Sequence, residues 1–255
     1  MAPTVGFEIN GAVGVVTLAK PPHNLIDSVL LDGILDSYRR AAESGCRAIL
    51  LKSAMRHFCA GADVSGFAPG APRRDQAGLE RLLSDLEDVG LPTIAAVHGA
   101  ALGGGFELAL TCDLFIAADT SSIGFAEVTL GLLPLLGGVQ RVAERAGKAR
   151  AKEMAMLGRR HDPRTLERWG IVNLVVAEAE LHNAALSWAR QLAAGPTIAL
   201  CGIKALANTA GKSGVAAADA RQTEVNSQMW ASEDQKRGLT AFRATGPGTA
   251  VFQGN

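Results

Sequence analysis

The sequence of 255 residues is long enough for one large domain that buries roughly three quarters of the surface its unfolded chain would expose. Its 25 basic and 25 acidic side chains cancel, which argues against the basic surface of a nucleic-acid-binding protein and the acidic tail of a cation-binding one. No stretch approaches the ~18 uninterrupted apolar residues of a membrane span, and the first residues lack a basic region followed by an apolar one. We therefore expect a cytoplasmic protein with no nucleic-acid partner and no membrane partner.

The cysteines and histidines show no metal-ligand pattern. The four cysteines are widely separated, without the paired spacing of zinc sites or small disulfide frameworks, and we expect them to be reduced and buried. No His-x-x-x-His pair occurs, and we interpret His57 and His98 as packed or turn residues. The sequence predicts no metal site.

The chain is predicted to begin with a β-hairpin and a helix. Residues 5–8 and 13–18 flank Asn10-Gly11, a pair that readily adopts the positive φ angles of a tight hairpin turn. After Pro21-Pro22, Asp27 is a suitable N-cap for a helix. The apolar residues that then recur at helical spacing are Leu30, Leu31, Ile34, Leu35 and Tyr38.

Buried strands and helices then alternate. A strand at 47–52 is followed by a loop at 63–74 and a helix that ends near Gly90; a strand at 93–97 leads straight into a glycine triplet and a helix at 106–110, and another strand follows at 113–117. This alternation predicts an α/β layer with parallel strands and right-handed crossovers.

Beyond Gly137 the sequence is almost entirely helical in pattern. The helices are expected at 138–146, 148–157, 163–169, 181–194 and in several segments of 197–242, with one strand-like run at 171–176. No Ser/Gly-rich linker separates the two parts. We predict a core that contains the active site at 1–195 and a helical C-terminal region at 196–255.

The glycine triplet Gly103-Gly104-Gly105 does not fit the common nucleotide-binding motifs. A dinucleotide fingerprint would need a glycine in place of Leu108, and Gly211-Lys212-Ser213 lacks the upstream glycine of a phosphate loop, because Leu206 stands there. What remains is a strand that ends at a helix N-terminus, with exposed backbone N–H groups. Such a turn is a candidate donor to a developing oxyanion.

A second turn, at 58–63, also follows a buried strand. Loops that follow neighbouring parallel strands lie at the same sheet edge, so one N–H from each turn could hold the same oxygen atom. A single such donor is worth roughly 3 kcal/mol, or about a hundredfold in rate. The alternative is that both are ordinary strand-to-helix turns.

Two glutamates in apolar surroundings could act beside that oxygen. Glu107 falls in the first turn of the predicted helix, where a simple favourable interaction with the helix dipole is the alternative role. Glu127 lies in an apolar segment without a predicted helix, and its alternative role is that of a solvated loop residue. Paired carboxyl groups at one site commonly divide the acid and base roles.

Together these segments resemble the crotonase, or enoyl-CoA hydratase/isomerase, superfamily. The resemblance implies a spiral of ββα units that forms a homotrimer or a dimer of trimers, with residues 196–255 serving in trimerisation and as a lid. It rests on Pro-His-Asn-Leu at 22–25, Phe-Cys-Ala-Gly-Ala-Asp at 58–63, the segment 97–109, Asp113, Glu127, Gly-Gly-Val-Gln-Arg at 137–141, Ser-Glu-Asp at 232–234, Gly238 and Ala241-Phe242.

The resemblance also implies roles for particular residues. The N–H groups of Ala62 and Gly104 would hold the thioester oxygen of an acyl-CoA, and Glu107 and Glu127 match the two glutamates that hydratases of the family use. These glutamates would activate water for attack at Cβ, and Glu127 would deliver the proton to Cα. Coenzyme A is then part of the substrate, and no separate cofactor is expected. The positions that match the lining of the CoA or acyl channel are Leu25, Ala60 and Asp63.

The sequence departs from the family pattern at three positions. Leu135 replaces a small residue beside the water site, Arg243 stands alone where a basic run is common, and His98 occupies a frequent asparagine position. The leading hypothesis is an enoyl-CoA hydratase that converts a 2-enoyl-CoA to a 3-hydroxyacyl-CoA. Leu135 motivates the alternative of a Δ3,Δ2-enoyl-CoA isomerase or another acyl-CoA lyase or hydrolase. The third hypothesis is a non-catalytic member of the fold that binds acyl-CoA or RNA.

Overall fold

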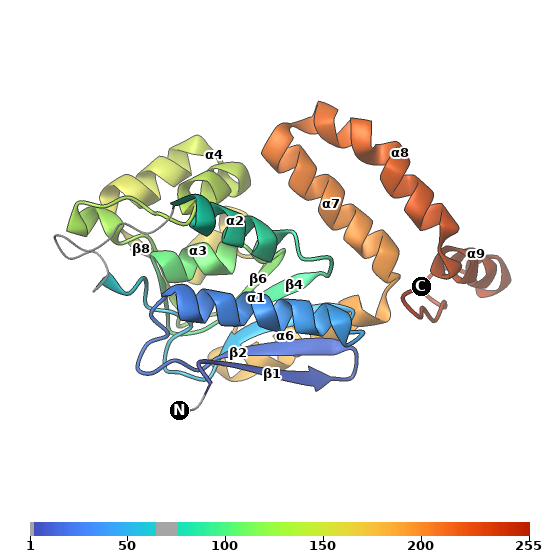
Figure 1. The fold of residues 1–255 in the computed structure, drawn as a ribbon, viewed down its shortest axis with the longest axis horizontal. Helices are drawn as coiled ribbons and strands as arrows, with labels where there is room; N and C mark the ends of the chain where they lie inside the picture. Colours follow the sequence, from blue (N-terminus) through green and yellow to red (C-terminus); the bar gives the residue numbers. More distant parts are fainter. Residues whose placement is uncertain (1–2, 65–75) are drawn as a thin grey trace.

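A twisted central sheet organises the chain (Figure 1). The computed structural model describes residues 3–64 and 76–255, so the predicted loop at 63–74 lies outside the described residues from 65 onward. Within these ranges the central sheet has six strands in the order β1-β2-β3-β4-β6-β9. Only the β1–β2 pair is antiparallel, and every other neighbouring pair in this described sheet is parallel. The strands are β1 (Val5–Asn10), β2 (Val13–Leu18), β3 (Ala48–Ser53), β4 (Thr93–Val97), β6 (Leu114–Ala118) and β9 (Leu174–Val176).

The predicted hairpin forms, but its turn lies one residue later than expected. Asn10 is the last residue of β1 and pairs with Val13. The positive φ belongs to Gly11, at 62°. Gly11 therefore occupies the first central position of the two-residue turn, where glycine is favoured, and Asn10 stays in the extended strand.

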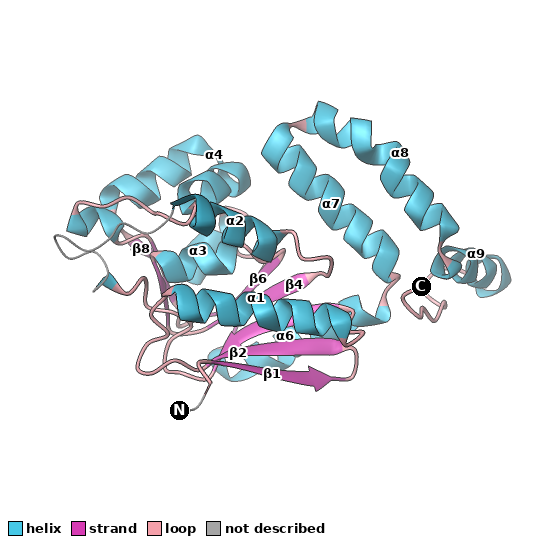
Figure 2. Cartoon of the chain, in the orientation of Figure 1, coloured by secondary structure: helices cyan, strands magenta, loops and turns pink. Residues whose placement is uncertain are grey.

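Helices cover both faces of the sheet (Figure 2). Successive side chains of a strand point to opposite faces, so each strand can pack against helices on both sides. In β4, Ile94 and Ala96 pack with helix α6 (Leu181–Ala194), whereas Ala95 and Val97 join the core on the opposite face. That opposite core includes apolar residues of α1 (Ser28–Glu43), α2 (Gln76–Glu87), α3 (Gly104–Leu110) and α4 (Gly138–Leu157). The predicted cap of α1 is confirmed, since Asp27 accepts a 2.9 Å hydrogen bond from the Leu30 N–H.

The sequence interpretation missed a small second sheet. In the described chain it consists of β5 (Ala100–Leu102), β7 (Ser122–Gly124) and β8 (Arg160–His161). The glycine triplet therefore follows β5 and not β4, which corrects the expected direct connection. Strands of two or three residues are too short to show a periodic pattern, so their pairing depends on tertiary contacts.

The C-terminal helices extend to one side of the sheet (Figure 1). Helices α7 (Thr197–Ser213) and α8 (Val215–Ala231) lie side by side, and α9 (Glu233–Thr245) follows them. The two predicted helices at 138–157 form α4 with a break at Gly147, whose φ is 82°. The short helices in the described ranges include α5 (Pro163–Arg168) and the 3-10 helices η2 (Glu127–Leu130) and η3 (Glu178–Glu180). The division at 195 and 196 stays a prediction; it falls between α6 and α7.

Candidate active site

The two glycine-containing turns predicted to hold an oxygen lie side by side. The Cys59 N–H donates to the Ala100 carbonyl and the Leu102 N–H donates to the Cys59 carbonyl, both at 3.1 Å. The first turn thus pairs with β5, the strand that leads into the glycine triplet. A Cβ atom on Gly105 would overlap the Cys59 carbonyl oxygen, so this close approach requires glycine. Direct pairing with β5, rather than a shared edge of the central sheet, brings the turns together.

The Ala62 and Gly104 amide groups are close neighbours at this junction. A Cβ atom placed on Gly104 would lie 3.6 Å from the Ala62 nitrogen. Ala62 is held by Ile26, which accepts from the Asp63 N–H and donates to the Gly61 carbonyl, both at 2.9 Å. Neither the Ala62 nor the Gly104 N–H donates to an acceptor among residues 3–64 and 76–255. This pair of N–H groups is therefore available to an oxygen atom of a ligand.

Asn24 anchors the segment behind the first turn, a role that sequence reasoning did not assign. It is fully buried with a positive φ of 54°. Its amide nitrogen donates to the Phe58 carbonyl at 2.9 Å and to Ser53 Oγ at 2.8 Å. Asparagine tolerates the left-handed conformation better than most residues, and its side chain supplies the hydrogen bonds that the buried turn needs.

Glu107 is buried in the first helical turn of α3, with 1% of its surface exposed. Its Oε1 atom accepts 2.8 Å hydrogen bonds from the N–H groups of Leu136 and Gly138. Burial raises the pKa of Glu107 to about 7, and the charge of Glu127 adds to this, while the two N–H groups and Arg141 oppose it. At neutral pH such a carboxyl group exchanges a proton readily.

Glu127 is half-buried and begins a 3-10 helix, η2 (Glu127–Leu130). This corrects the expectation of a position without helical structure. Its Oε2 atom accepts from the Ala126 N–H at 2.8 Å, and burial raises its pKa. A Cβ atom on Gly103 would lie 2.7 Å from Glu127 Oε1, which places this carboxyl beside the glycine triplet. Glu107 lies three residues after Gly104 in α3 and binds the N–H of Leu136, whose side chain also approaches Gly104.

The residues predicted to contact the substrate share one property, partial exposure to solvent. Leu25, Ala60, Asp63 and Leu135 are all half-buried. Ala60 also lines a cleft of about 410 Å³, together with His23, His57, Leu102 and Arg160 among others.

Leu136, next to Leu135, is the leucine that approaches the triplet. Its Cδ1 atom would lie 3.5 Å from a Cβ atom on Gly104. Sequence reasoning singled out Leu135 and did not consider Leu136. The glycines at 137 and 138 could have indicated a tight turn there, but not which side chain enters the site.

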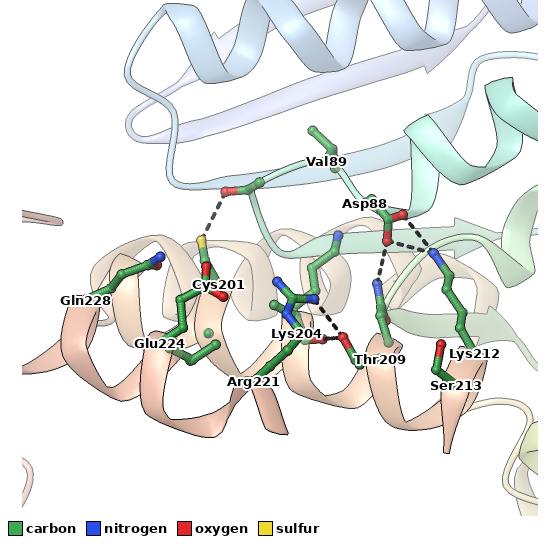
Figure 3. Close-up of a pocket in the computed structure, with 15 residues that line it drawn as sticks. Asp88, Val89, Cys201, Lys204, Thr209, Lys212, Ser213, Arg221, Glu224 and Gln228 are labelled. Atoms are coloured by element: carbon green, nitrogen blue, oxygen red, sulfur yellow. Dashed lines mark hydrogen bonds and ion pairs between the residues drawn. The ribbon is translucent and has the colours of Figure 1, made fainter. Parts of the chain in front are cut away.

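A larger cleft of about 690 Å³ lies between the C-terminal helices and residues 88–90 (Figure 3). Its walls carry Lys204, Lys212 and Arg221 from α7 and α8. None of the residues predicted for the active site lines it. The residues predicted for the active site are therefore separate from this cleft.

The histidines and cysteines take part in packing and backbone hydrogen bonds. His98 Nε2 contacts the Met55 carbonyl at 2.8 Å, and His57 Nδ1 accepts from the Ala100 N–H at 3.2 Å. All four cysteines are free, and Cys201 is half-buried rather than buried as expected. In the part of the chain that the structure describes, no cluster of three potential metal ligands occurs.

Comparison with known proteins identifies the family to which this architecture belongs. The sequence profile of the enoyl-CoA hydratase/isomerase family matches residues 8–251. The chain belongs to this family. A probable enoyl-CoA hydratase of Rhizobium meliloti (strain 1021) is 35% identical over 250 residues, which cover 94% of this chain and 95% of that protein. The carnitinyl-CoA dehydratase of Proteus mirabilis (strain HI4320) is 36% identical over 208 residues, or 80% of each.

Solved structures support the same assignment. An enoyl-CoA hydratase subunit I of Geobacillus kaustophilus HTA426 superposes with a TM-score of 0.90 at 34% identity, covering 99% of this chain and 98% of that one. The predicted α/β crotonase-like fold is thereby confirmed. No helix in the described ranges is long and apolar enough to cross a bilayer.

Proposed function

We propose that this family member is an enoyl-CoA hydratase that adds water across the 2,3 double bond of a 2-enoyl-CoA. The observation that carries the proposal is the pair of buried or half-buried carboxyl groups beside two N–H groups that have no acceptor in the described chain. Two relatives of this chain are named a probable enoyl-CoA hydratase and a carnitinyl-CoA dehydratase, and both names indicate a CoA thioester as substrate. Dehydration is the reverse of the proposed reaction.

In the proposed mechanism, the thioester oxygen accepts hydrogen bonds from the Ala62 and Gly104 N–H groups. These bonds strengthen as negative charge develops on that oxygen in the enolate, so they stabilise the transition state more than the bound substrate. Each N–H is worth roughly 3 kcal/mol by analogy with oxyanion donors in other enzymes.

The two glutamates would handle the protons. Ionised Glu107 removes a proton from water as the hydroxyl group bonds to Cβ, and protonated Glu127 delivers a proton to Cα. Transfer of a proton from Glu107 to Glu127 through water restores the starting state. The pKa of about 7 at Glu107 suits a general base near neutral pH.

The hydrogen bonds around Glu107 fit this role. Two N–H groups hold Oε1, so Oε2 is the oxygen left to contact water. We assign the substrate channel to the surroundings of Leu25, Ala60, Asp63 and Leu135. Coenzyme A then enters as part of the substrate, and the reaction needs no further cofactor.

An isomerase is the second candidate, favoured by the half-buried Leu135 and the buried Leu136 beside the donor pair. Large apolar side chains there would exclude water, and a single glutamate could then move a proton between Cα and Cγ of a 3-enoyl-CoA. The two carboxyl groups favour hydration instead.

Product analysis in ¹⁸O-labelled water tests the proposal. The purified protein would be incubated with 2-enoyl-CoA and 3-enoyl-CoA thioesters of several chain lengths. A hydratase forms 3-hydroxyacyl-CoA with the label at C3, whereas an isomerase forms 2-enoyl-CoA without label. Unlabelled products alone, or no turnover of any 2-enoyl-CoA, would exclude the proposed hydratase.

A further inference from the structure

The geometry of Glu107 depends on the turn that precedes α4. The N–H groups of Leu136 and Gly138 both bind Glu107 Oε1 at 2.8 Å, so any displacement of this turn moves the carboxyl group. Gly137, between them, has a φ of 76°, a conformation that few side chains tolerate. Glycine adopts this conformation without strain, and the contacts of neighbouring side chains hold the turn in place.

Arg141, in the first turn of α4, provides that support. Its Nη1 atom donates to the carbonyl oxygens of Leu136 and Gly137, each at 3.3 Å. A Cβ atom on Gly137 would lie 2.5 Å from this Nη1, which shows how closely the guanidinium lies against the turn. Arg141 thus binds the carbonyl side of the same turn whose N–H side binds Glu107.

The other edge of the guanidinium is held by Glu87, the last residue of α2. Arg141 Nε lies 3.1 Å from Oε1 and Nη2 lies 3.0 Å from Oε2, a two-pronged ion pair. The side chains are only 15% and 17% exposed, so solvent screens this pair less than a surface pair.

Lys212 of α7 also reaches Glu87, at 3.2 Å from Oε2. The same ammonium group binds Asp88, at the edge of the larger cleft (Figure 3). Because Lys212 is 41% exposed, we assign it a smaller contribution than Arg141.

We propose that Arg141 and Glu87 are positioning residues for Glu107, and that they act by fixing the Leu136–Gly138 turn. The proposal rests on the proposed function, in which Glu107 contacts the attacking water. Neither residue needs to touch the substrate. The specific requirement is the planar fork of arginine, which bridges a carboxylate on one edge and two carbonyls on the other.

Steady-state kinetics of Arg141→Met, Arg141→Lys and Glu87→Gln test the proposal. We expect kcat to fall about tenfold to a hundredfold in Arg141→Met, with little change in KM, because misplacing a catalytic group affects the chemical step. Arg141→Lys should lose nearly as much, since lysine keeps the charge but not the fork. Recovery of wild-type kcat by Arg141→Lys would reduce the role to electrostatics and overturn the positioning proposal.

The same substitution in a Glu107→Gln background separates positioning from general stability. If Arg141 acts through Glu107, Arg141→Met should cause no further loss once Glu107 is replaced. Lys204→Met is the matched control, because Lys204 forms a comparably buried ion pair with Asp113 outside the predicted site. Independent, multiplying losses, or an equal fall in kcat in the control, would contradict the proposal.

A titration of the Glu107 carboxyl by ¹³C NMR decides the question even if no hydratase activity is found. The charged groups that act on Glu107 are Glu127, which raises its pKa, and Arg141, which lowers it. Arg141→Met should raise the pKa of Glu107 by removing that positive charge. Arg141→Lys keeps the charge but not the fork, so a displaced turn should still broaden or shift the carboxyl signal in this variant. An unchanged signal in Arg141→Lys would overturn the positioning role, whereas a shifted signal without turnover would contradict only the proposed function.

Discussion

Glu107 shows how far single residues can be understood from sequence. Its first-turn position and apolar neighbours made it a candidate catalytic acid or base, with a simple helix-dipole interaction as the alternative, and the structure shows 1% of its surface exposed. Its partners, the backbone N–H groups of Leu136 and Gly138, could not be predicted. Those groups belong to a loop about 30 residues away, and any residue except proline supplies an N–H.

The raised pKa of Glu107 makes a prediction for stability. Since the folded-state pKa is about 7 against an ordinary 4.5, the folded chain holds a proton that the unfolded chain has released between these pH values. The contribution of this group to the free energy of unfolding is therefore present at low pH and is lost as the pH rises towards 7. As the pH rises, the free energy of unfolding of Glu107→Gln should increasingly exceed that of wild type, by up to about 3 kcal/mol at pH 8.

Thermal and denaturant unfolding of the two proteins from pH 5 to pH 8 would measure this difference. Glutamine can still accept both N–H bonds through its amide oxygen, so the comparison isolates the charge. A difference that does not change with pH would contradict the pKa assigned to Glu107.

At the scale of elements, long periodic segments were predictable and short pairings were not. The helix capped by Asp27 and the helix at 181–194 appear as expected. Strands β5, β7 and β8 were missed because two or three residues carry no periodic signal. As a result, we expected both donor turns at one edge of the central sheet, whereas the glycine triplet follows β5 of the small sheet.

The contact between α3 and the first turn gives an element-scale prediction. Gly105→Ala would force a Cβ atom into the Cys59 carbonyl, so we expect a loss of about 1–3 kcal/mol in unfolding free energy. Turnover should fall as well, because Gly104 moves with the helix. Gly90→Ala is the control: no atom lies within 4 Å of its added Cβ, and about 0.5 kcal/mol or less is expected. Equal effects in both variants would refute this packing account.

At the scale of the whole molecule, the C-terminal helices carry several exposed large apolar side chains. Ile203, Val215, Trp230 and Phe242 are each between 58% and 69% exposed. Several large apolar side chains on one appendage are typical of a surface that another chain covers. The homotrimer or dimer of trimers, with residues 196–255 as the trimerisation and lid region, stays a prediction, and these side chains are the ones we expect at its contacts.

Light scattering would test the predicted assembly. We expect a mass of three or six chains, and Trp230→Glu with Phe242→Glu should lower it because a buried charge opposes association. Ile9→Glu, an exposed apolar residue on β1, is the control and should leave the mass unchanged. A monomer in the wild-type protein would refute the predicted assembly.

The central claim is that two glutamates beside two N–H groups hydrate a 2-enoyl-CoA, and the loss of enoyl-CoA absorbance tests it most directly. Initial rates with crotonyl-CoA would be compared for wild type, Glu107→Gln and Glu127→Gln. Removal of a general acid or base should lower kcat by about a hundredfold to ten-thousandfold in each variant. Rates in both variants equal to wild type, or no absorbance loss in wild type with any 2-enoyl-CoA, would contradict the account.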